Sequence, residues 1–128
     1  MQQDHFSGWQ VLGCELCAAG QYSEALAAFD RALAINPRDG DTWSFRGNAL
    51  SALQRPAEAL NSYDKAVAIN AEHHQAWFNR GLLLAEMQAY GLAQAAYDRA
   101  IALHPDPRYL HAKAEIWLKR KLVAYPGV

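Results

Sequence analysis

Apolar side chains recur along this chain every three or four residues, the spacing that places them on one side of an α-helix. The first such stripe is formed by Trp9, Leu12, Gly13 and Leu16. A second stripe follows at Ala25, Phe29 and Ala32, after the breaker-rich stretch AAGQYS. The pattern therefore predicts two helices joined by a short turn.

The same pattern returns with a period of 34 residues. Trp9, Trp43 and Trp77 share one position, and the next shared positions are Gly13, Gly47 and Gly81, then Leu16, Leu50 and Leu84, then Ala25, Ala59 and Ala93, then the aromatic Phe29, Tyr63 and Tyr97. The joints LQRPAE and MQAYGL separate the two halves of the later copies, and Pro56 suits the first turn of a helix. Three helix–turn–helix copies are predicted, over about residues 6–39, 40–73 and 74–107.

The glycines of this pattern need a reason, because Gly costs about 1 kcal/mol relative to Ala inside a helix. Gly13 and Ala25 lie on the two helices of one copy, where small side chains allow two backbones to approach closely. One such pair cannot bury its apolar side alone, so neighbouring pairs are expected to stack.

The pattern W-x2-L-G-x2-L, then A-x3-F, then P resembles the tetratricopeptide repeat, a 34-residue helix–turn–helix unit. The resemblance implies an all-α fold, a right-handed helical solenoid of antiparallel helix pairs with about seven helices, in one domain over residues 1–128. The chain departs from the family at Arg46 and Arg80, where Leu is usual, and only the first copy keeps a Gly, Gly20, at its inter-helix turn.

Residues 108–124 predict a seventh helix, which continues the register as a first half without a second half. In repeat arrays such a helix caps the last repeat. Ile116, Trp117 and Leu118 are then expected to pack partly on the third copy. Alternatively, the missing partner helix leaves apolar residues exposed for self-association; the candidates are Ile116, Trp117, Val123 and Tyr125.

Tetratricopeptide arrays line their concave side with the first helix of each repeat, so the resemblance implies a partner-binding groove there. On this register the groove residues are Gln10, Val11, Cys14, Ser44, Phe45, Asn48, Gln75, Phe78, Asn79, Leu82, Lys113 and Arg120. Asn48 and Asn79 each offer a donor and an acceptor, which suits the backbone of a bound peptide.

Two arginines predict ion pairs between neighbouring repeats. Arg46 follows Asp30, and Arg80 follows Asp64, by the same 16 residues. We expect Asp30–Arg46 and Asp64–Arg80 pairs, because hydrogen-bonded Arg–carboxylate contacts orient neighbouring elements well.

The small net charge and the few cations at the groove positions argue against two classes of ligand, nucleic acids and chaperone carboxylate tails. The formal net charge is −1, and the groove positions carry few cations, so nucleic acid is not expected as a partner. Some tetratricopeptide domains clamp the carboxylate tail of heat-shock chaperones with cations; the matching positions here are Gln10, Cys14, Phe45, Gln75 and Asn79, so no such clamp is expected. Lys113 and Arg120, in a basic C-terminal helix, could favour an acidic ligand segment at that end.

No catalytic site, cofactor or metal site is predicted. Cys14 and Cys17 form a C-x-x-C pair without a second pair for zinc, and they lie inside a helix rather than at its N-terminus, where redox thiols lie. The sequence has no secretory signal and no apolar run long enough to span a membrane, so a cytoplasmic location is expected. The predicted function is a non-enzymatic adaptor or assembly scaffold that binds a peptide or helical segment of a partner; the alternative is a module that dimerises through its C-terminal helix.

Overall fold

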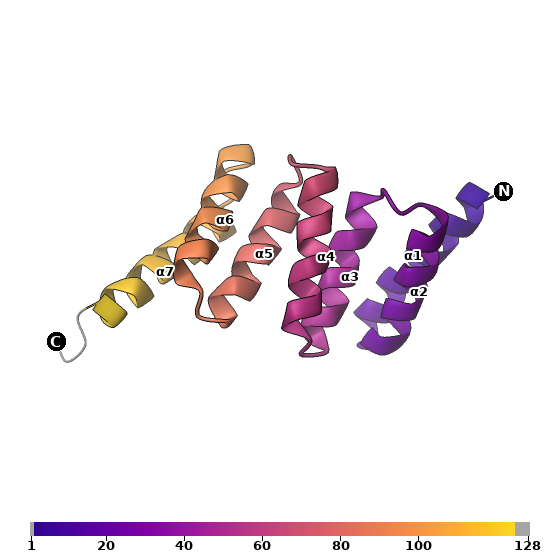
Figure 1. The fold of residues 1–128 in the computed structure, drawn as a ribbon, viewed down its shortest axis with the longest axis horizontal. Helices are drawn as coiled ribbons and strands as arrows, with labels where there is room; N and C mark the ends of the chain where they lie inside the picture. Colours follow the sequence, from indigo (N-terminus) through magenta and orange to yellow (C-terminus); the bar gives the residue numbers. More distant parts are fainter. Residues whose placement is uncertain (1, 125–128) are drawn as a thin grey trace. The chain divides into compact units, whose positions relative to one another are not determined.

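The computed structural model describes the backbone of residues 2–124 and the side chains of residues 5–122. This part of the chain contains seven α-helices and no strand (Figure 1). The helices are α1 (Gln2–Ala18), α2 (Tyr22–Ile35), α3 (Gly40–Ala52), α4 (Pro56–Ile69), α5 (His74–Glu86), α6 (Tyr90–Leu103) and α7 (Pro107–Ala124). The predicted all-α class is confirmed, and Pro56 begins a helix as expected.

The chain divides into two compact units, residues 1–71 and 72–128. In the first unit α1 packs on α2 and α3 packs on α4, while α3 also contacts α2. In the second unit α5 packs on α6, and α7 contacts α6. Each unit thus repeats one rule, in which a helix pair is followed by a helix that packs on the second member of that pair. The expectation of a single domain over the whole chain stays a prediction.

Close contact between a glycine and an aromatic ring holds each helix pair together. A Cβ atom built on Gly47 would lie 2.5 Å from the Tyr63 ring, and one on Gly13 would lie 2.3 Å from the Phe29 ring. Such distances are too short for any real Cβ, so only Gly lets the ring approach this closely. The sequence predicted that these glycines allow a close approach between the two helices of a pair, and in the structure the atoms that approach Gly13 and Gly47 are those of an aromatic ring.

The turns inside the pairs share one backbone conformation. Gly20, Gln54 and Gln88 all have a positive φ, at 77°, 61° and 63°. Gly adopts this left-handed region freely, whereas Gln does so at a cost. The second and third turns therefore keep the geometry of the first without its glycine.

Helix α7 is displaced by one residue from the predicted register. The segment before α3 is residues 36–39, whereas the segment before α7 is only residues 104–106. The Asp39 carbonyl accepts from the Trp43 backbone N–H and the Asp106 carbonyl accepts from the Leu110 N–H, each at 3.2 Å, so the two aspartates mark equivalent helix starts. Counted from these aspartates, Tyr109 takes the place of Thr42. The expectation that α7 continues the 34-residue spacing is wrong by one position, because its connecting segment is shorter.

Candidate functional site

The predicted groove residues of the first unit lie on α1 and α3, which we call the first-helix face of that unit. Val11 and Asn48 are exposed, while Gln10, Cys14 and Phe45 are partly buried. Ser44 was also assigned to this face, but its side chain is only 3% exposed. That assignment is corrected, because a hydroxyl buried inside the helix packing is not accessible to a ligand.

The amide of Gln10 has a structural role. Its Nε2 donates to Asp39 Oδ2 at 3.1 Å and to Thr42 Oγ1 at 2.9 Å. These bonds tie α1 to the first turn of α3. Gln10 therefore orders the first-helix face, whatever binds there.

Asn48 is oriented by the second helix of its own pair. Tyr63 Oη donates to Asn48 Oδ1 at 2.6 Å. The ring of Phe45 stacks on Phe29, with centroids 5.9 Å apart. Both groove residues are thus held by core aromatics, which fixes the face before any ligand arrives.

The two cysteines behave as packing residues. Cys14 and Cys17 lie against the buried cluster of Ala25, Phe29 and Ala49. Burial raises the pKa of the Cys14 thiol, and burial together with Cys14 raises the pKa of Cys17. A raised pKa lowers the thiolate fraction, so neither thiol is activated for chemistry.

In the second unit the first-helix face consists of α5 and α7. Gln75 is exposed, Leu82 is nearly half exposed, and Phe78 and Asn79 are partly buried. Phe78 stacks on Tyr109, with centroids 4.3 Å apart. The apolar floor predicted for the groove therefore includes a ring from α7.

A histidine pair joins α5 to the start of α7. His74 Nδ1 lies 2.7 Å from Tyr109 Oη, and the His74 ring stacks on His104 with centroids 4.5 Å apart. Burial lowers the pKa of His74, and the neighbouring His104 and His73 lower it further. No sequence pattern indicated a role for these histidines, and the structure places them at a joint between helices.

A hollow of about 170 Å³ opens between α5 and α7. Its lining residues are Leu82, Ala85, Glu86, Tyr97, Ala112, Glu115, Ile116 and Lys119. Burial raises the pKa of Tyr97 to about 12, and Glu115 and Glu86 add to the shift. The hollow therefore combines an apolar lining with a charged rim, and it has room for one side chain of a ligand.

The two cations assigned to the groove contact the second helix of the pair instead. Lys113 Nζ lies 2.7 Å from Asp98 Oδ1, and Arg120 Nη1 donates to Gln94 Oε1 at 2.6 Å. Both partners belong to α6. The expectation that Lys113 and Arg120 line the groove followed from the uncorrected register of α7, and the contacts with α6 argue against it.

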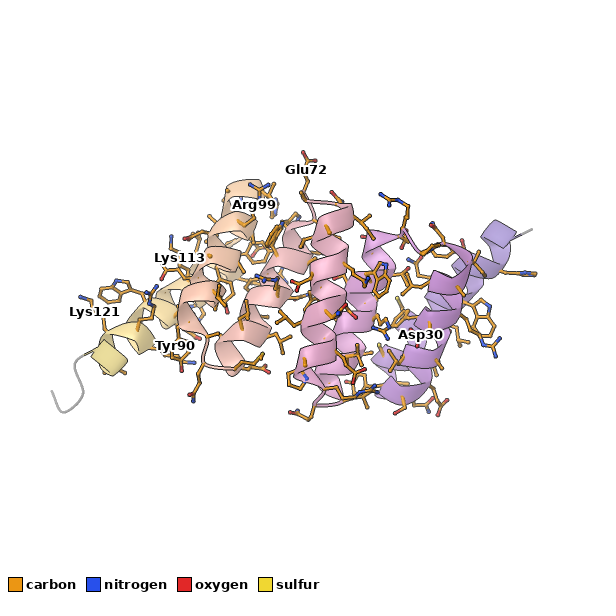
Figure 2. The ribbon with its side chains drawn as sticks, viewed as in Figure 1. Asp30, Glu72, Tyr90, Arg99, Lys113 and Lys121 are labelled. Carbon is orange, nitrogen blue, oxygen red and sulfur yellow. The ribbon has the colours of Figure 1, made fainter. Side chains whose placement is uncertain are left out.

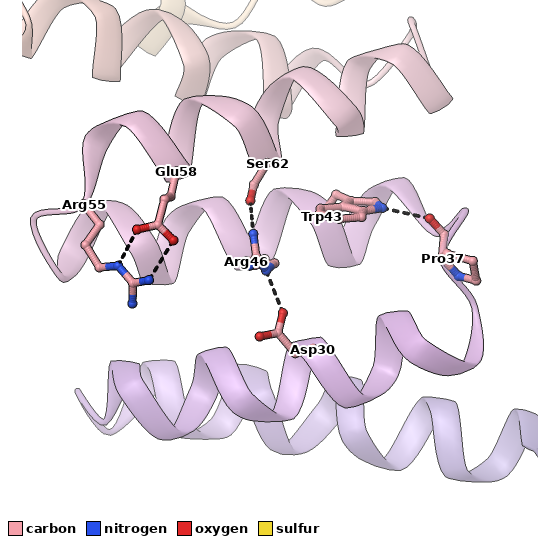
Figure 3. A network of polar contacts seen from close by, with 7 residues as sticks. All are labelled: Asp30, Pro37, Trp43, Arg46, Arg55, Glu58 and Ser62. Carbon is pink, nitrogen blue, oxygen red and sulfur yellow. Dashed lines mark hydrogen bonds and ion pairs between the residues drawn. The ribbon is translucent and has the colours of Figure 1, made fainter.

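The predicted ion pair between Asp30 and Arg46 is confirmed, with Nε and Oδ1 2.7 Å apart (Figure 3). Arg46 also donates through Nη1 to Ser62 Oγ at 2.8 Å, and Ser62 is fully buried. Ser62 was missed, although one signal was available, because the other copies have Ala28 and Ala96 at its position. The Asp64–Arg80 pair stays a prediction.

A cation lies over the tryptophan of each complete repeat. Arg31 lies 5.0 Å from the Trp9 ring centroid, Lys65 lies 5.2 Å from that of Trp43, and Arg99 lies 5.9 Å from that of Trp77. These cations are also spaced by 34 residues, a signal that the sequence analysis overlooked. The repetition indicates a packing role for the tryptophans.

Of the residues predicted for self-association, Ile116 is only 2% exposed. It packs inside the second unit and is not available to another molecule, so its assignment is corrected. Trp117 is 54% exposed, as that hypothesis requires. The Val123 side chain and Tyr125 lie outside the described residues.

Among the described residues, no group of three or more His, Cys, Asp or Glu side chains could hold a metal ion. In the same part of the chain, no helix is both long and apolar enough to cross a membrane. The predicted cytoplasmic location stays a prediction.

Comparison with known proteins decides the family. The model of the tetratricopeptide repeat matches residues 11–71 and 45–106, which is more than half of the chain. The chain belongs to the tetratricopeptide repeat family. A search of curated proteins by sequence found no match.

Solved tetratricopeptide domains share the fold at low sequence identity. The first such domain of Spaghetti (RPAP3), bound to the HSP90 peptide SRMEEVD, has a TM-score of 0.89 at 21% identity and covers 92% of this chain and 97% of its own. The Sgt2 domain from Aspergillus fumigatus has a TM-score of 0.90 at 22% identity, with 96% and 85% covered. The Yersinia enterocolitica secretion chaperone SycD, in complex with a YopD peptide, has a TM-score of 0.85 at 17% identity, with 91% and 95% covered. These tetratricopeptide structures establish the fold of the chain.

Proposed function

We propose that this tetratricopeptide protein is a non-enzymatic interaction module that holds a peptide or helical segment of a partner protein on its first-helix faces. The observation that carries the proposal is the hollow between α5 and α7, which lies on that face and is lined by Leu82 and Ala112. A pocket of this size and apolar lining suits an anchoring side chain of a bound segment.

Two solved structures of the same fold support this proposal. A solved domain of the same fold holds an HSP90 peptide, and another is in complex with a peptide of a translocator. We therefore propose that this chain binds a peptide segment as well, as an adaptor or assembly scaffold. We propose that the ligand is not a chaperone carboxylate tail, because Gln10 and Gln75 stand where a carboxylate clamp needs cations.

The charges at the rim of the hollow restrict which ligand side chains can bind there. Glu86 and Glu115 lie at the hollow with Lys119 as the one cation among its lining residues. An acidic ligand side chain would meet two carboxylates there. We propose that the anchoring residue is apolar and that an acidic neighbour is disfavoured at this point, unlike the preference first expected for Lys113 and Arg120.

A phage-displayed random peptide library, selected on the wild-type protein, tests the proposal. The selected peptides should bind at least about tenfold more weakly to Leu82→Glu, because a charge at the hollow repels the anchoring residue. Leu92→Glu is the matched control, since Leu92 is also exposed and lies on α6, away from the hollow. Equal binding to wild type and Leu82→Glu would refute the assignment.

The polar part of the face needs its own variant. Asn48→Ala combined with Asn79→Ala removes the two amides that we assign to the backbone of the bound segment. Affinity of the selected peptides should fall while circular dichroism at 222 nm stays unchanged. Affinity that does not fall would remove the asparagines from the site and leave the hollow as the anchor.

A further inference from the structure

Helix α7 carries a second apolar surface outside the first-helix face. Leu110, Trp117 and Leu118 are 49%, 54% and 56% exposed. Together with Lys113 and Ala114 they line a shallow apolar groove of about 510 Å³. We call Leu110, Ala114, Trp117 and Leu118 the open face of α7.

The repeat register identifies what kind of element fits this surface. Counted from the helix-start aspartates, Ala114 takes the position of Gly47 and Trp117 that of Leu50. In the first unit α4 packs on α3, the Tyr63 ring of α4 lies against Gly47, and Leu50 is fully buried. The open face is therefore the surface that the second helix of a fourth repeat would cover, and it suits a single amphipathic helix.

One residue distinguishes the open face from its complete counterparts. The Tyr63 ring approaches Gly47 so closely that a Cβ there would lie 2.5 Å from it. Ala114 carries that Cβ, so an aromatic ring cannot occupy the same place over α7. The occupant has a smaller side chain, of about the size of Leu, at the position opposite Ala114.

The charges of α7 select the sign of the occupant. The helix contains Arg108, Lys113, Lys119, Arg120 and Lys121 against Glu115 alone. Lys113 lines the open groove, and Lys121 Nζ lies 5.1 Å from the Trp117 ring centroid. Figure 2 labels both lysines. Glu115 lies at the other surface, where it lines the hollow and pairs with His111 at 2.8 Å. The lining residues include no carboxylate, but Lys113 is paired with Asp98 of α6 at 2.7 Å, so the positive character of the open face comes from Lys121 and from the excess of cations on α7.

We propose that the open face of α7 docks one acidic amphipathic helix of a partner protein, in the manner in which α4 covers α3. A second copy of this chain is the less favourable occupant, because it would bring one basic α7 helix against another. The inference does not rest on the proposed groove function, since it concerns a different surface of the helix.

The probe for this proposal is a pair of stapled peptides built on the sequence of α2, the 14 residues Tyr22–Ile35. Both peptides carry Phe29→Leu, to match Ala114. The acidic peptide adds Arg31→Glu, and the basic peptide adds Glu24→Lys and Asp30→Lys. Stapling is needed because isolated helices of this length are marginal in water. The apolar stripe is the same in both, so a difference in affinity reports charge.

Fluorescence anisotropy of the labelled peptides on the full chain gives the result. We expect the acidic peptide to bind at least about tenfold more tightly than the basic one, with a preference that weakens as salt rises. Trp117→Glu should abolish binding of the acidic peptide, and Leu92→Glu should leave it unchanged. Trp117→Glu should also spare the peptides selected for the first-helix face, which separates failure here from failure of the proposed function.

Three results would overturn the proposal. One is equal affinity for the two peptides, and another is acidic-peptide binding that survives Trp117→Glu. The third is a dimer in sedimentation velocity that Trp117→Glu dissolves and that the acidic peptide does not displace, because a second copy would then be the occupant.

Discussion

Helices α3 and α7 hold equivalent places in their repeats, but within residues 2–124 a second helix follows α3 and none follows α7. On α3 both Ala49 and Leu50 are fully buried. On α7 the equivalent residues are Ile116, which is buried, and Trp117, which is half exposed. The contact with the preceding helix pair therefore buries one stripe of a first helix, and the helix that follows buries the other.

On α7 the residues that attach the helix to its unit differ from the residues that it leaves exposed. Ile116 and Tyr109 hold the helix to its unit, and the open face contributes little to that attachment. Helix α7 is thus held to its unit on one side and presents an apolar surface on the other. Adjacent residues on one helix should accordingly respond very differently to truncation.

The largest expected effect is the loss of Ile116. Ile116→Ala should lower the free energy of unfolding by about 2–5 kcal/mol, because it removes buried methyl groups and leaves a cavity. Trp117→Ala removes a larger side chain, yet it should change the stability by no more than about 0.5 kcal/mol, since the ring is half exposed. Urea denaturation followed by circular dichroism measures both. Equal losses at the two positions would mean that α7 does not have one buried and one open side.

The next effect exchanges the small residues of the two helices. Gly47→Ala forces a Cβ against the Tyr63 ring and should cost about 1–3 kcal/mol. Ala114→Gly, at the equivalent place on α7, relieves no clash and should cost about 1 kcal/mol through helix propensity alone. Gly91→Ala is the control, because nothing lies within 4 Å of a Cβ there and the substitution should stabilise α6. Thermal unfolding of the three variants gives the order; a neutral Gly47→Ala would contradict the glycine–ring contact.

The helix pairs could be predicted from the sequence because the spacing of apolar residues follows from which side of each helix is buried. The 34-residue repeat of Trp43, Gly47 and Leu50 sufficed for the helix pairs and for a close approach at the glycines, and the 16-residue interval predicted the Asp30–Arg46 pair. The one-residue shift of α7 escaped, since spacing alone did not show that its connecting segment is shorter. That shift changed the site most, because it moves Lys113 from the groove to Asp98.

A third comparison concerns the cation on each helix. Arg46 on α3 pairs with Asp30 and also donates to the buried Ser62, whereas Lys113 on α7 pairs with Asp98 on a partly exposed surface. Arg46→Met should cost about 1–3 kcal/mol, because it leaves the Ser62 hydroxyl buried without this donor. Lys113→Met should cost no more than about 1 kcal/mol. The double variant Arg46→Met/Ser62→Ala should recover part of the loss, and failure to recover would assign the cost to the ion pair.

The attachments of the two helices also differ in their dependence on pH. Thr42 of α3 is bonded to the amide of Gln10 and to the carboxylate of Asp39, while Tyr109 of α7 is bonded to His74, a residue type whose ordinary pKa lies close to neutral pH. The pKa of His74 is lowered in the folded chain, so the unfolded chain binds more protons as the pH falls below about 6.5, and stability falls with it. Asp106 opposes the shift, while His104, His73 and Arg108 favour it.

We expect the melting temperature to be lower at pH 5.5 than at pH 7.5. The difference between the two values should be smaller in His74→Gln than in the wild type. The Gln side chain can still bond to Tyr109 but does not take up a proton. Differential scanning calorimetry at the two values of pH measures the difference. An identical fall in wild type and variant would show that other groups cause the pH dependence.

The smallest expected effect lies in the turn between the two helices of a repeat. Gln54 returns the chain from α3 to α4 with a φ of 61°, and Gly20 makes the same turn in the first repeat with a φ of 77°. Gln54→Gly relieves the left-handed strain but enlarges the entropy of the unfolded chain, so a net gain of about 0.5 kcal/mol is expected. Gln21→Gly, one residue beyond the equivalent turn and outside the left-handed region with a φ of −94°, should give no gain. A loss of stability in Gln54→Gly would mean that the Gln54 side chain stabilises the turn by more than its positive φ costs. The connection from α3 to α4 would then depend on that side chain as well as on the backbone conformation.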